Sequence, residues 1–319
     1  MAKRGRNKNV VNVIIAAFFS GILLAIYTWI YSDKEDPSCP HRCALKPAFV
    51  NSSHSPGSNG RQAWVILVAD DTPVEPNGLS YADSAAVLVH TLQRAGTSRE
   101  IVVLVDHKIS SATRMKLEAL KTVVREIDNK MPPENYRMSK KRERMQYSYT
   151  KLWAFTLTEY SKVVYVDADM FALPWCRDID AMFAYASPAA SLEYFATDSF
   201  QCGMYVIEPS QELFDDIEEK RHDVCSYENR GVDSGFMNCY FKDRWHEVEQ
   251  RFNAQYFCNT RPFDDRCKAF NRDWWNNIEK RKDLCMVHDK IFKHLRAKSE
   301  VNEVWWKAFE ETQGKLKNA

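Results

Sequence analysis

Short, continuous apolar segments of this chain lead directly into aspartates. They are residues 64–69, 101–105 and 163–166, followed by Asp70, Asp106 and Asp167. Apolar residues at helical spacing lie at 80–95, 110–121 and 149–160, and residues 123–127 form another strand-like run. Continuous apolar strands that alternate with helices predict an α/β fold with a mostly parallel central sheet covered on both faces. We assign residues 62–319 to one such domain.

The aspartates are expected at one edge of this sheet, where open α/β sheets bind their ligands beyond the carboxyl ends of the strands. Asp167 and Asp169 lie two residues apart at such an end. A hard divalent cation prefers carboxylate oxygens, and phosphate oxygens can complete its coordination shell. The cation would neutralise charge on a departing diphosphate. The pattern by itself is equally compatible with two acidic residues in the loop after a strand.

Residues 9–32 contain no charged side chain and can form a helix of about 36 Å, which is long enough to cross a bilayer. The basic residues ahead of this run are Lys3, Arg4, Arg6 and Lys8. This positive flank predicts a cytosolic tail at residues 1–8 and a luminal or external remainder. A cleaved signal peptide is the alternative, but the run is too long and lacks a small-x-small cleavage site at its end. We therefore expect a signal anchor and a type II membrane protein.

Residues 33–61 are rich in proline, glycine, serine and asparagine, a composition that predicts a stem rather than a packed core. The N-glycosylation sequon Asn51-Ser52-Ser53 fits a luminal stem. The chain has nine cysteines, several of which would pair in an oxidising compartment. The odd total leaves one thiol free or intermolecular, which is compatible with a homodimer, disulfide-linked or non-covalent. A net charge of +1 provides no basic field for nucleic acid.

Three segments resemble glycosyltransferase family 8, the glycogenin-like group that includes plant glucuronosyltransferases of xylan. The first runs from the TKLW segment at 150–153 to the strand and aspartates at 163–170. The second, FQCGMYVIEPS at 200–210, resembles the family's Phe-Asn-Ser/Cys-Gly-x-x-Val-x-x-Pro-Ser segment. The third, GVDSGFMN at 231–238, resembles its Gly-Gly-Asp-Gln-Gly-x-x-Asn segment. The order and spacing of the segments agree over residues 63–290.

The resemblance implies a GT-A fold, a UDP-sugar donor, Mn²⁺ and transfer with retention of anomeric configuration. By position, the metal ligands would be Asp167, Asp169 and His288. Lys151 would contact the donor and Asp233 would lie beside the donor sugar, so these two are the candidate catalytic residues. The other residues placed at the donor are Asp70, Arg142, Gln201, Gly203 and Ser234.

Simpler structural roles compete with these assignments. Lys151 could be a solvated surface lysine. Asp233 could cap a helix, a role that can coexist with one beside the donor sugar. His288 could simply be hydrogen-bonded in a loop, and Arg142 belongs to a mixed-charge run that is typical of a solvated surface. Helical spacing around Trp305-Trp306 favours core packing over a platform for a sugar ring.

The chain also departs from the family pattern. Gln201 stands where the family usually has asparagine, and Ser234 where it usually has glutamine. After His288 the chain reads DKIFKH, whereas the family normally reads Phe-x-Gly-x-x-Lys-Pro-Trp. The glycine is missing and the lysine is displaced, so the contacts to the diphosphate and the identity of the sugar stay open.

We therefore expect a membrane enzyme of the Golgi or endoplasmic reticulum. It would transfer a hexose, hexuronic acid or N-acetylhexosamine from a UDP-sugar to a glycan, glycolipid or protein. One alternative is a nucleotidyltransferase of similar fold, which would use a nucleoside triphosphate and release pyrophosphate. The other is a non-catalytic relative that binds glycans or serves as a scaffold.

Overall fold

A computed structural model describes residues 60–74, 76–134, 145–193, 199–222, 232–255, 278–293 and 300–318. The predicted anchor at 9–32, most of the predicted stem with its sequon, and Arg142 lie outside these ranges. Within them, no helix combines the length and apolar character that crossing a bilayer requires.

The described elements are as follows. The strands are β1 (Gln62–Val68), β2 (Glu100–Asp106), β3 (Val123–Ile127), β4 (Lys162–Val166), β5 (Met170–Ala172), β6 (Ala189–Leu192), β7 (Phe200–Ile207), β8 (His246–Val248), β9 (Ala254–Gln255) and β10 (Met286–His288). The α-helices are α2 (Tyr81–Arg94), α3 (Ser111–Ala119), α4 (Gln211–Lys220), α5 (Asp233–Tyr240), α7 (Ile278–Asp283) and α8 (Glu300–Lys317). The 3₁₀ helices are η2 (Ser148–Thr156), η3 (Ile179–Ala184), η5 (Gln250–Phe252) and η8 (Ile291–Lys293).

The larger sheet has seven strands in the order β3-β2-β1-β4-β7-β6-β8. Strands β3, β2, β1 and β4 run parallel, β7 is antiparallel to both β4 and β6, and β8 is parallel to β6. The predicted apolar runs form β1, β2, β3 and β4, so the mostly parallel sheet is confirmed.

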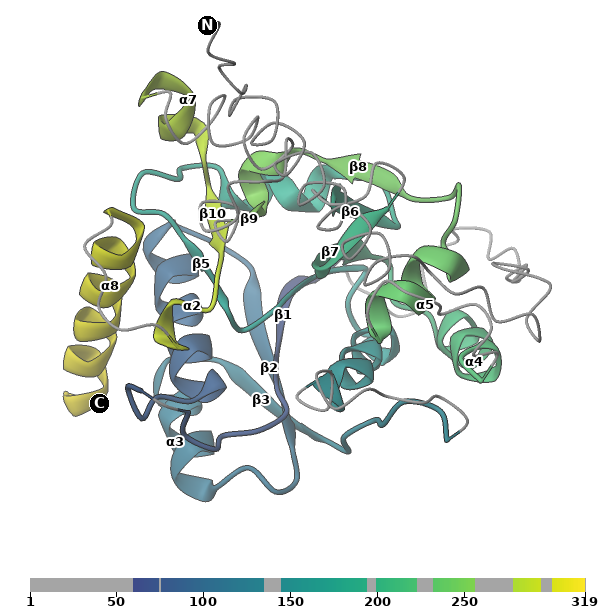
Figure 1. The fold of residues 1–319 in the computed structure, drawn as a ribbon, viewed down its shortest axis with the longest axis horizontal. Helices are drawn as coiled ribbons and strands as arrows, with labels where there is room; N and C mark the ends of the chain where they lie inside the picture. The colour runs from purple at the N-terminus through teal and green to yellow at the C-terminus, as the bar shows by residue number, and fades with distance from the viewer. Residues whose placement is uncertain are drawn as a thin grey trace, which may run out of the picture. The chain divides into compact units, whose positions relative to one another are not determined.

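Both faces of this sheet are covered by helices (Figure 1). Along β1, Trp64 and Ile66 face a core built with α2 and α3. The alternate residues Ala63 and Val65 face a second core built with η2, α4 and α5. Because both faces are buried, the strands read as continuous apolar runs.

A second sheet of three short strands has the order β5-β10-β9. Strand β10 is antiparallel to β5 and parallel to β9. A disulfide between Cys176 and Cys285, with Cα atoms 4.6 Å apart, joins the segment after β5 to the residue before β10. Helix α8 contributes the buried Trp305 to the core beside this sheet, which confirms the packing role predicted for that tryptophan.

The helix predicted at 149–160 is instead the 3₁₀ helix η2, which ends at Thr156. A 3₁₀ helix brings residues three apart onto one line. Tyr149, Leu152 and Phe155 share that spacing, and all three are fully buried. The tighter helix therefore places one row of large side chains against the sheet.

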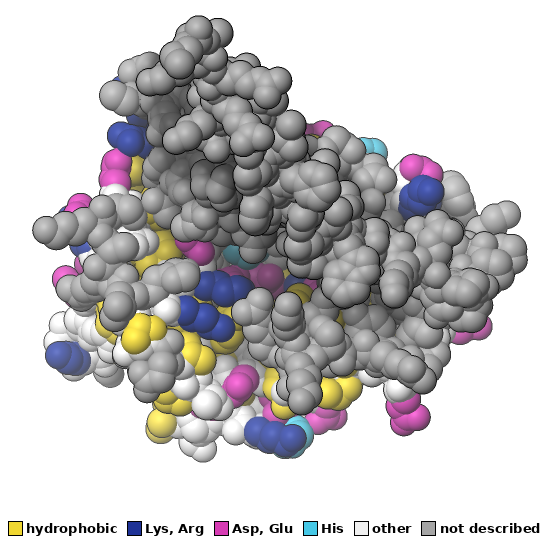
Figure 2. Space-filling model, in the orientation of Figure 1, with side chains coloured by type: hydrophobic (Ala, Val, Ile, Leu, Met, Phe, Trp, Pro, Cys, Tyr) yellow, Lys and Arg dark blue, Asp and Glu magenta, His cyan; other side chains and the backbone are white. Residues whose placement is uncertain are grey.

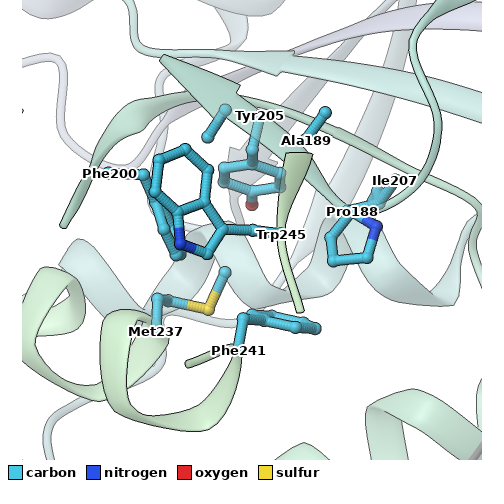
Figure 3. A pocket seen from close by; sticks show the side chains of 9 residues that line it. Pro188, Ala189, Phe200, Tyr205, Ile207, Met237, Phe241 and Trp245 are labelled. Carbon is cyan, nitrogen blue, oxygen red and sulfur yellow. The ribbon is translucent and has the colours of Figure 1, made fainter. Parts of the chain in front are cut away.

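Helix α5 is fixed to β7 by apolar packing (Figure 3). Phe200 and Tyr205 of β7 face Met237 and Phe241, and Trp245 closes the group. The gap that these side chains leave is about 10 Å³, roughly the space of one water molecule. The packing leaves no room for an organic ligand here, and it holds the first residue of α5, Asp233, at the carboxyl end of the neighbouring strands.

Candidate active site

Asp167, Asp169 and His288 converge where the two sheets meet. Asp167 follows β4 and donates its backbone N–H to Gly203 O over 2.7 Å. Asp169 precedes β5, and His288 ends β10. The candidate ligand atoms of the three side chains all lie within 4.8 Å of one another. The structure thus brings together the three metal ligands predicted from the sequence.

The chemistry of this cluster fits a divalent cation. Asp169 Oδ1 is buried 3.2 Å from His288 Nε2, but the two groups are not aligned as a hydrogen bond, and Oδ1 accepts none from the described residues. A buried carboxylate oxygen without a donor is costly unless a cation or solvent molecule satisfies it. Two carboxylates and one imidazole are suitable ligands for Mn²⁺ or a similar cation.

Positive side chains balance the buried Asp169. Burial favours the neutral acid, but Lys290 and then His288 outweigh that effect and hold the pKa of Asp169 well below its usual range. Lys290 contacts Asp169 Oδ2 directly. Burial lowers the pKa of His288, whereas the neighbouring Asp169 raises it, and the net direction is upward.

Lys151 is buried between two carboxylates, so it is not a solvated surface residue. Its Nζ lies 3.1 Å from Asp167 Oδ1, 2.8 Å from Asp233 Oδ2 and 3.0 Å from Cys202 O. These three acceptors match the three N–H groups of an ammonium. Burial opposes the charge, but Asp167 and Asp233 outweigh it and raise the pKa of Lys151 well above its ordinary value. Lys151 therefore fixes the separation of the two carboxylates.

Asp233 is the first residue of α5, and its side chain makes no capping hydrogen bond. The cap position belongs to Val232 instead. The predicted capping role of Asp233 is therefore wrong, because Asp233 lies one residue inside the helix. Its carboxylate instead contacts Lys151 inside the site.

Gly203 is a point of close backbone approach. A Cβ atom built there would lie 2.9 Å from Asp167 Oδ2 and 2.8 Å from Gln201 Oε1, and it would collide with the imidazole of His288. Only glycine leaves room for the cluster at this position of β7.

The described site residues share one cavity of about 400 Å³. Those predicted from the sequence that line it are Asp70, Lys151, Asp167, Asp169, Gln201, Gly203, Asp233, Ser234 and His288. Figure 2 shows basic, acidic and histidine side chains close together near the centre of this face. A volume of this size accommodates a nucleotide-sized ligand.

Two lysines of the cavity wall were not assigned from the sequence. Lys290 lies on Asp169, and Lys293 donates to Tyr81 Oη over 3.0 Å with its Nζ 4.3 Å from the centre of that ring. Both occur in the segment after His288 that departs from the family pattern. The displaced lysine of that segment was the sequence signal that could have located them. Asn253, which contacts His288 Nδ1 at 3.1 Å, was also missed, and its sequence context carries no signal.

Comparisons with known proteins show the family of the chain. The family model described as "Glycosyl transferase family 8" matches residues 79–288. A putative UDP-glucuronate:xylan alpha-glucuronosyltransferase 5 of Arabidopsis thaliana is 27% identical over 247 residues, covering 74% of this chain and 41% of the relative. Glycogenin-1 of Caenorhabditis elegans is 30% identical over 200 residues, covering 62% of this chain and 43% of the relative. The chain thus spans less than half the length of either relative.

Solved structures show the same fold. The glycosyltransferase GlyE of Streptococcus pneumoniae superposes with a TM-score of 0.57 at 16% identity, covering 81% of this chain and 63% of GlyE. The alternating α/β architecture is therefore that of a GT-A-like glycosyltransferase. The family match to residues 79–288, more than half of the chain's length, places the chain in glycosyltransferase family 8.

Proposed function

We propose that the chain is a retaining glycosyltransferase that moves a sugar from a UDP-sugar to a glycan, glycolipid or protein acceptor. The observation that carries the proposal is the convergence of Asp167, Asp169 and His288 on the cavity that also contains the Lys151–Asp233 pair. Membership of the family supports the donor class. The donor sugar, whether hexose, hexuronic acid or N-acetylhexosamine, and the acceptor are left to experiment.

The proposed cation is Mn²⁺, held by Asp167, Asp169 and His288. When bound, it would supply Lewis-acid stabilisation of the diphosphate leaving group. The orphaned oxygen of Asp169 supports cation binding. Lys151 positions Asp167 in this arrangement through the 3.1 Å contact.

Lys290 and Lys293 are proposed to replace the displaced family lysine at the diphosphate. Both line the cavity, and Lys290 lies beside the metal cluster. Ammonium groups bind phosphate oxygens as point charges, and they need not come from one fixed position of the chain.

Asp233 is proposed to face the donor sugar. Its carboxylate lines the cavity and is oriented by Lys151 at 2.8 Å. In a double displacement this carboxylate would attack the anomeric carbon, whereas a same-face mechanism would use it only to stabilise positive charge on the sugar. Trapping a covalent glycosyl-enzyme on Asp233 would select the first mechanism.

We propose a type II membrane location in the Golgi or endoplasmic reticulum, with residues 9–32 as the anchor and 33–61 as the luminal stem. The Cys176–Cys285 disulfide supports an oxidising compartment, because cytosolic proteins rarely keep such bonds. A homodimer stays a prediction from the odd number of cysteines.

The test uses the full-length chain in detergent with a panel of UDP-sugars and candidate acceptors. We expect hydrolysis or transfer that requires Mn²⁺, is lost with EDTA and is lost in the Asp167→Ala, Asp169→Ala double variant. The exposed Asp215→Ala is the matched control and keeps full activity. Release of pyrophosphate from a nucleoside triphosphate would instead identify a nucleotidyltransferase, and absence of UDP binding would identify a non-catalytic relative.

A further inference from the structure

Asn253 lies behind the metal cluster and does not line the cavity. It is fully buried immediately before β9, which runs parallel to β10 with His288 opposite Gln255. Its Oδ1 lies 3.1 Å from His288 Nδ1, on the side of the ring away from Asp169. Asn253 therefore contacts the imidazole at the nitrogen that faces away from the cavity.

A backbone amide fixes which way the Asn253 side chain points. The N–H of Gly203 can only donate, so the Gln201 side-chain atom that it contacts is the oxygen Oε1. The same oxygen lies 3.3 Å from the Asn253 amide, which must present its nitrogen there. That nitrogen also donates to Ser191 Oγ over 2.7 Å. The atom of Asn253 that faces His288 is consequently the oxygen.

An amide oxygen facing His288 favours one tautomer of the ring. This oxygen can only accept, so it pairs with the neutral imidazole that carries its hydrogen on Nδ1, the form whose Nε2 is free to bind a cation. The lone pair on Nε2 then points at the buried Asp169 Oδ1, 3.2 Å away. Two lone pairs facing each other repel unless a cation lies between them, and the amide thus prepares Nε2 as a ligand.

We propose that Gln201 and Asn253 are positioning residues, which relay the orientation of the Gly203 N–H to His288 and set its Nδ1–H tautomer for cation binding. The proposal rests on the proposed function of the metal cluster. It also gives Gln201, which replaces the family's usual asparagine, a role beyond contact with the donor. The tautomer can be measured in the metal-free chain without substrate, so its test is independent of sugar transfer.

The first test is NMR of the metal-free, full-length chain with ¹³C- and ¹⁵N-labelled histidine. The spectrum is recorded in alkaline buffer, where the imidazole is neutral. The chain has eight histidines, and the His288→Gln variant identifies the relevant signal. We expect the Nδ1–H tautomer in the wild type and a shift towards Nε2–H in Asn253→Leu, because Asp169 Oδ1 is then the only acceptor left among the two that face the ring nitrogens. An Nε2–H wild type would overturn the proposal.

The second test is Mn²⁺ affinity, followed by electron paramagnetic resonance of free Mn²⁺. We expect Asn253→Leu to weaken binding about 10- to 100-fold, the usual effect of losing a partner behind a ligand. Asn253→Asp, which keeps an oxygen on Nδ1, is expected to recover most of the loss. Ser191→Ala is the matched control, because it removes a hydrogen bond from the same amide but leaves Gln201 to orient it.

The outcomes separate positioning from stability. Equal losses of affinity in Asn253→Leu and Ser191→Ala would show a merely structural role and overturn the proposal. If Asn253→Leu does not fold, Gln201→Leu replaces it and is expected to give a mixture of the two tautomers. An unchanged single tautomer in Gln201→Leu would contradict the relay. A correct tautomer in a chain that transfers no sugar would refute the proposed function and leave the relay intact.

Discussion

The two sheets of the molecule are stabilised differently, and the metal cluster depends on both. Strands β1, β2 and β7 of the larger sheet have seven or eight residues, whereas β5, β10 and β9 have two or three. Residues of both sheets are buried on both faces, but the smaller sheet has much shorter strands and is joined by a disulfide and packed against α8. Asp167 directly follows β4 of the larger sheet, whereas Asp169 directly precedes β5 and His288 ends β10 of the smaller one. The positions of Asp169 and His288 therefore depend on the stability of the smaller sheet.

Removing the carboxylate of Asp169, which lies between the two sheets, is expected to have the largest effect on sugar transfer. Asp169→Asn keeps the volume of the side chain but removes the charge at the entrance to β5. We expect transfer to fall about 100- to 1000-fold, as for the loss of a group that stabilises transition-state charge. The measurement is the initial rate at saturating Mn²⁺. Asp178→Asn, at a half-exposed ion pair with Arg251 near the same sheet, is the control and should retain its rate. Equal rates for the two variants would contradict the role of Asp169.

Removing the disulfide of the smaller sheet is expected to have the next largest effect. The Cys176→Ser, Cys285→Ser double variant removes a bond that closes a long loop of 109 residues. We expect the free energy of unfolding to fall by about 2–5 kcal/mol, as measured by chemical denaturation. Mn²⁺ affinity should fall as well, because Cys285 lies three residues before His288. Wild-type protein treated with a reductant should behave in the same way, and unchanged affinity in both would show that the sheet holds His288 without the disulfide.

The same difference explains which parts of the fold were predicted from the sequence. Strands β1, β2 and β4 were predicted because strands buried on both faces leave continuous apolar runs. Strand β3, which is only partly buried, was predicted from its short strand-like run. The smaller sheet was not predicted as a unit, because strands of two or three residues have no periodicity. The 3₁₀ form of η2 was also missed, since its apolar spacing resembles that of an α-helix.

The site divides along similar lines. Asp167 and Asp169 follow a strand that the sequence shows as a continuous apolar run, and the family resemblance located His288. The contacts of Lys151 with Asp233, and of His288 with Asn253, join residues distant in sequence. No local pattern reports such pairs, because they are created only when the elements pack.

Matched valine-to-alanine substitutions in the two sheets are expected to have a smaller effect, and they test whether the sheets differ in their influence on Mn²⁺ binding. Val65 in β1 and Val287 in β10 are both fully buried. Changing either to alanine should reduce the free energy of unfolding by roughly 2 kcal/mol, through lost apolar burial and the cavity left behind. Only Val287→Ala should also weaken Mn²⁺ binding by the folded protein, because it precedes His288. Calorimetric titration of both variants checks this, and equal affinities would show that the two sheets tolerate cavities equally.

The smallest expected effect comes from a charge at the end of the smaller sheet. Lys293 lies in η8 just after β10 and reaches the cavity beside Tyr81. We expect Lys293→Met to raise KM for the UDP-sugar about five- to tenfold with little change in kcat, because the proposed, partly solvated charge contact to the diphosphate would be lost. Lys293→Arg keeps the charge and should restore most of the affinity. Lys151→Met in η2, which packs on the larger sheet, should instead reduce kcat, because it releases both Asp167 and Asp233. A kcat effect at Lys293 with an unchanged KM would place that lysine at the reacting sugar instead of the diphosphate.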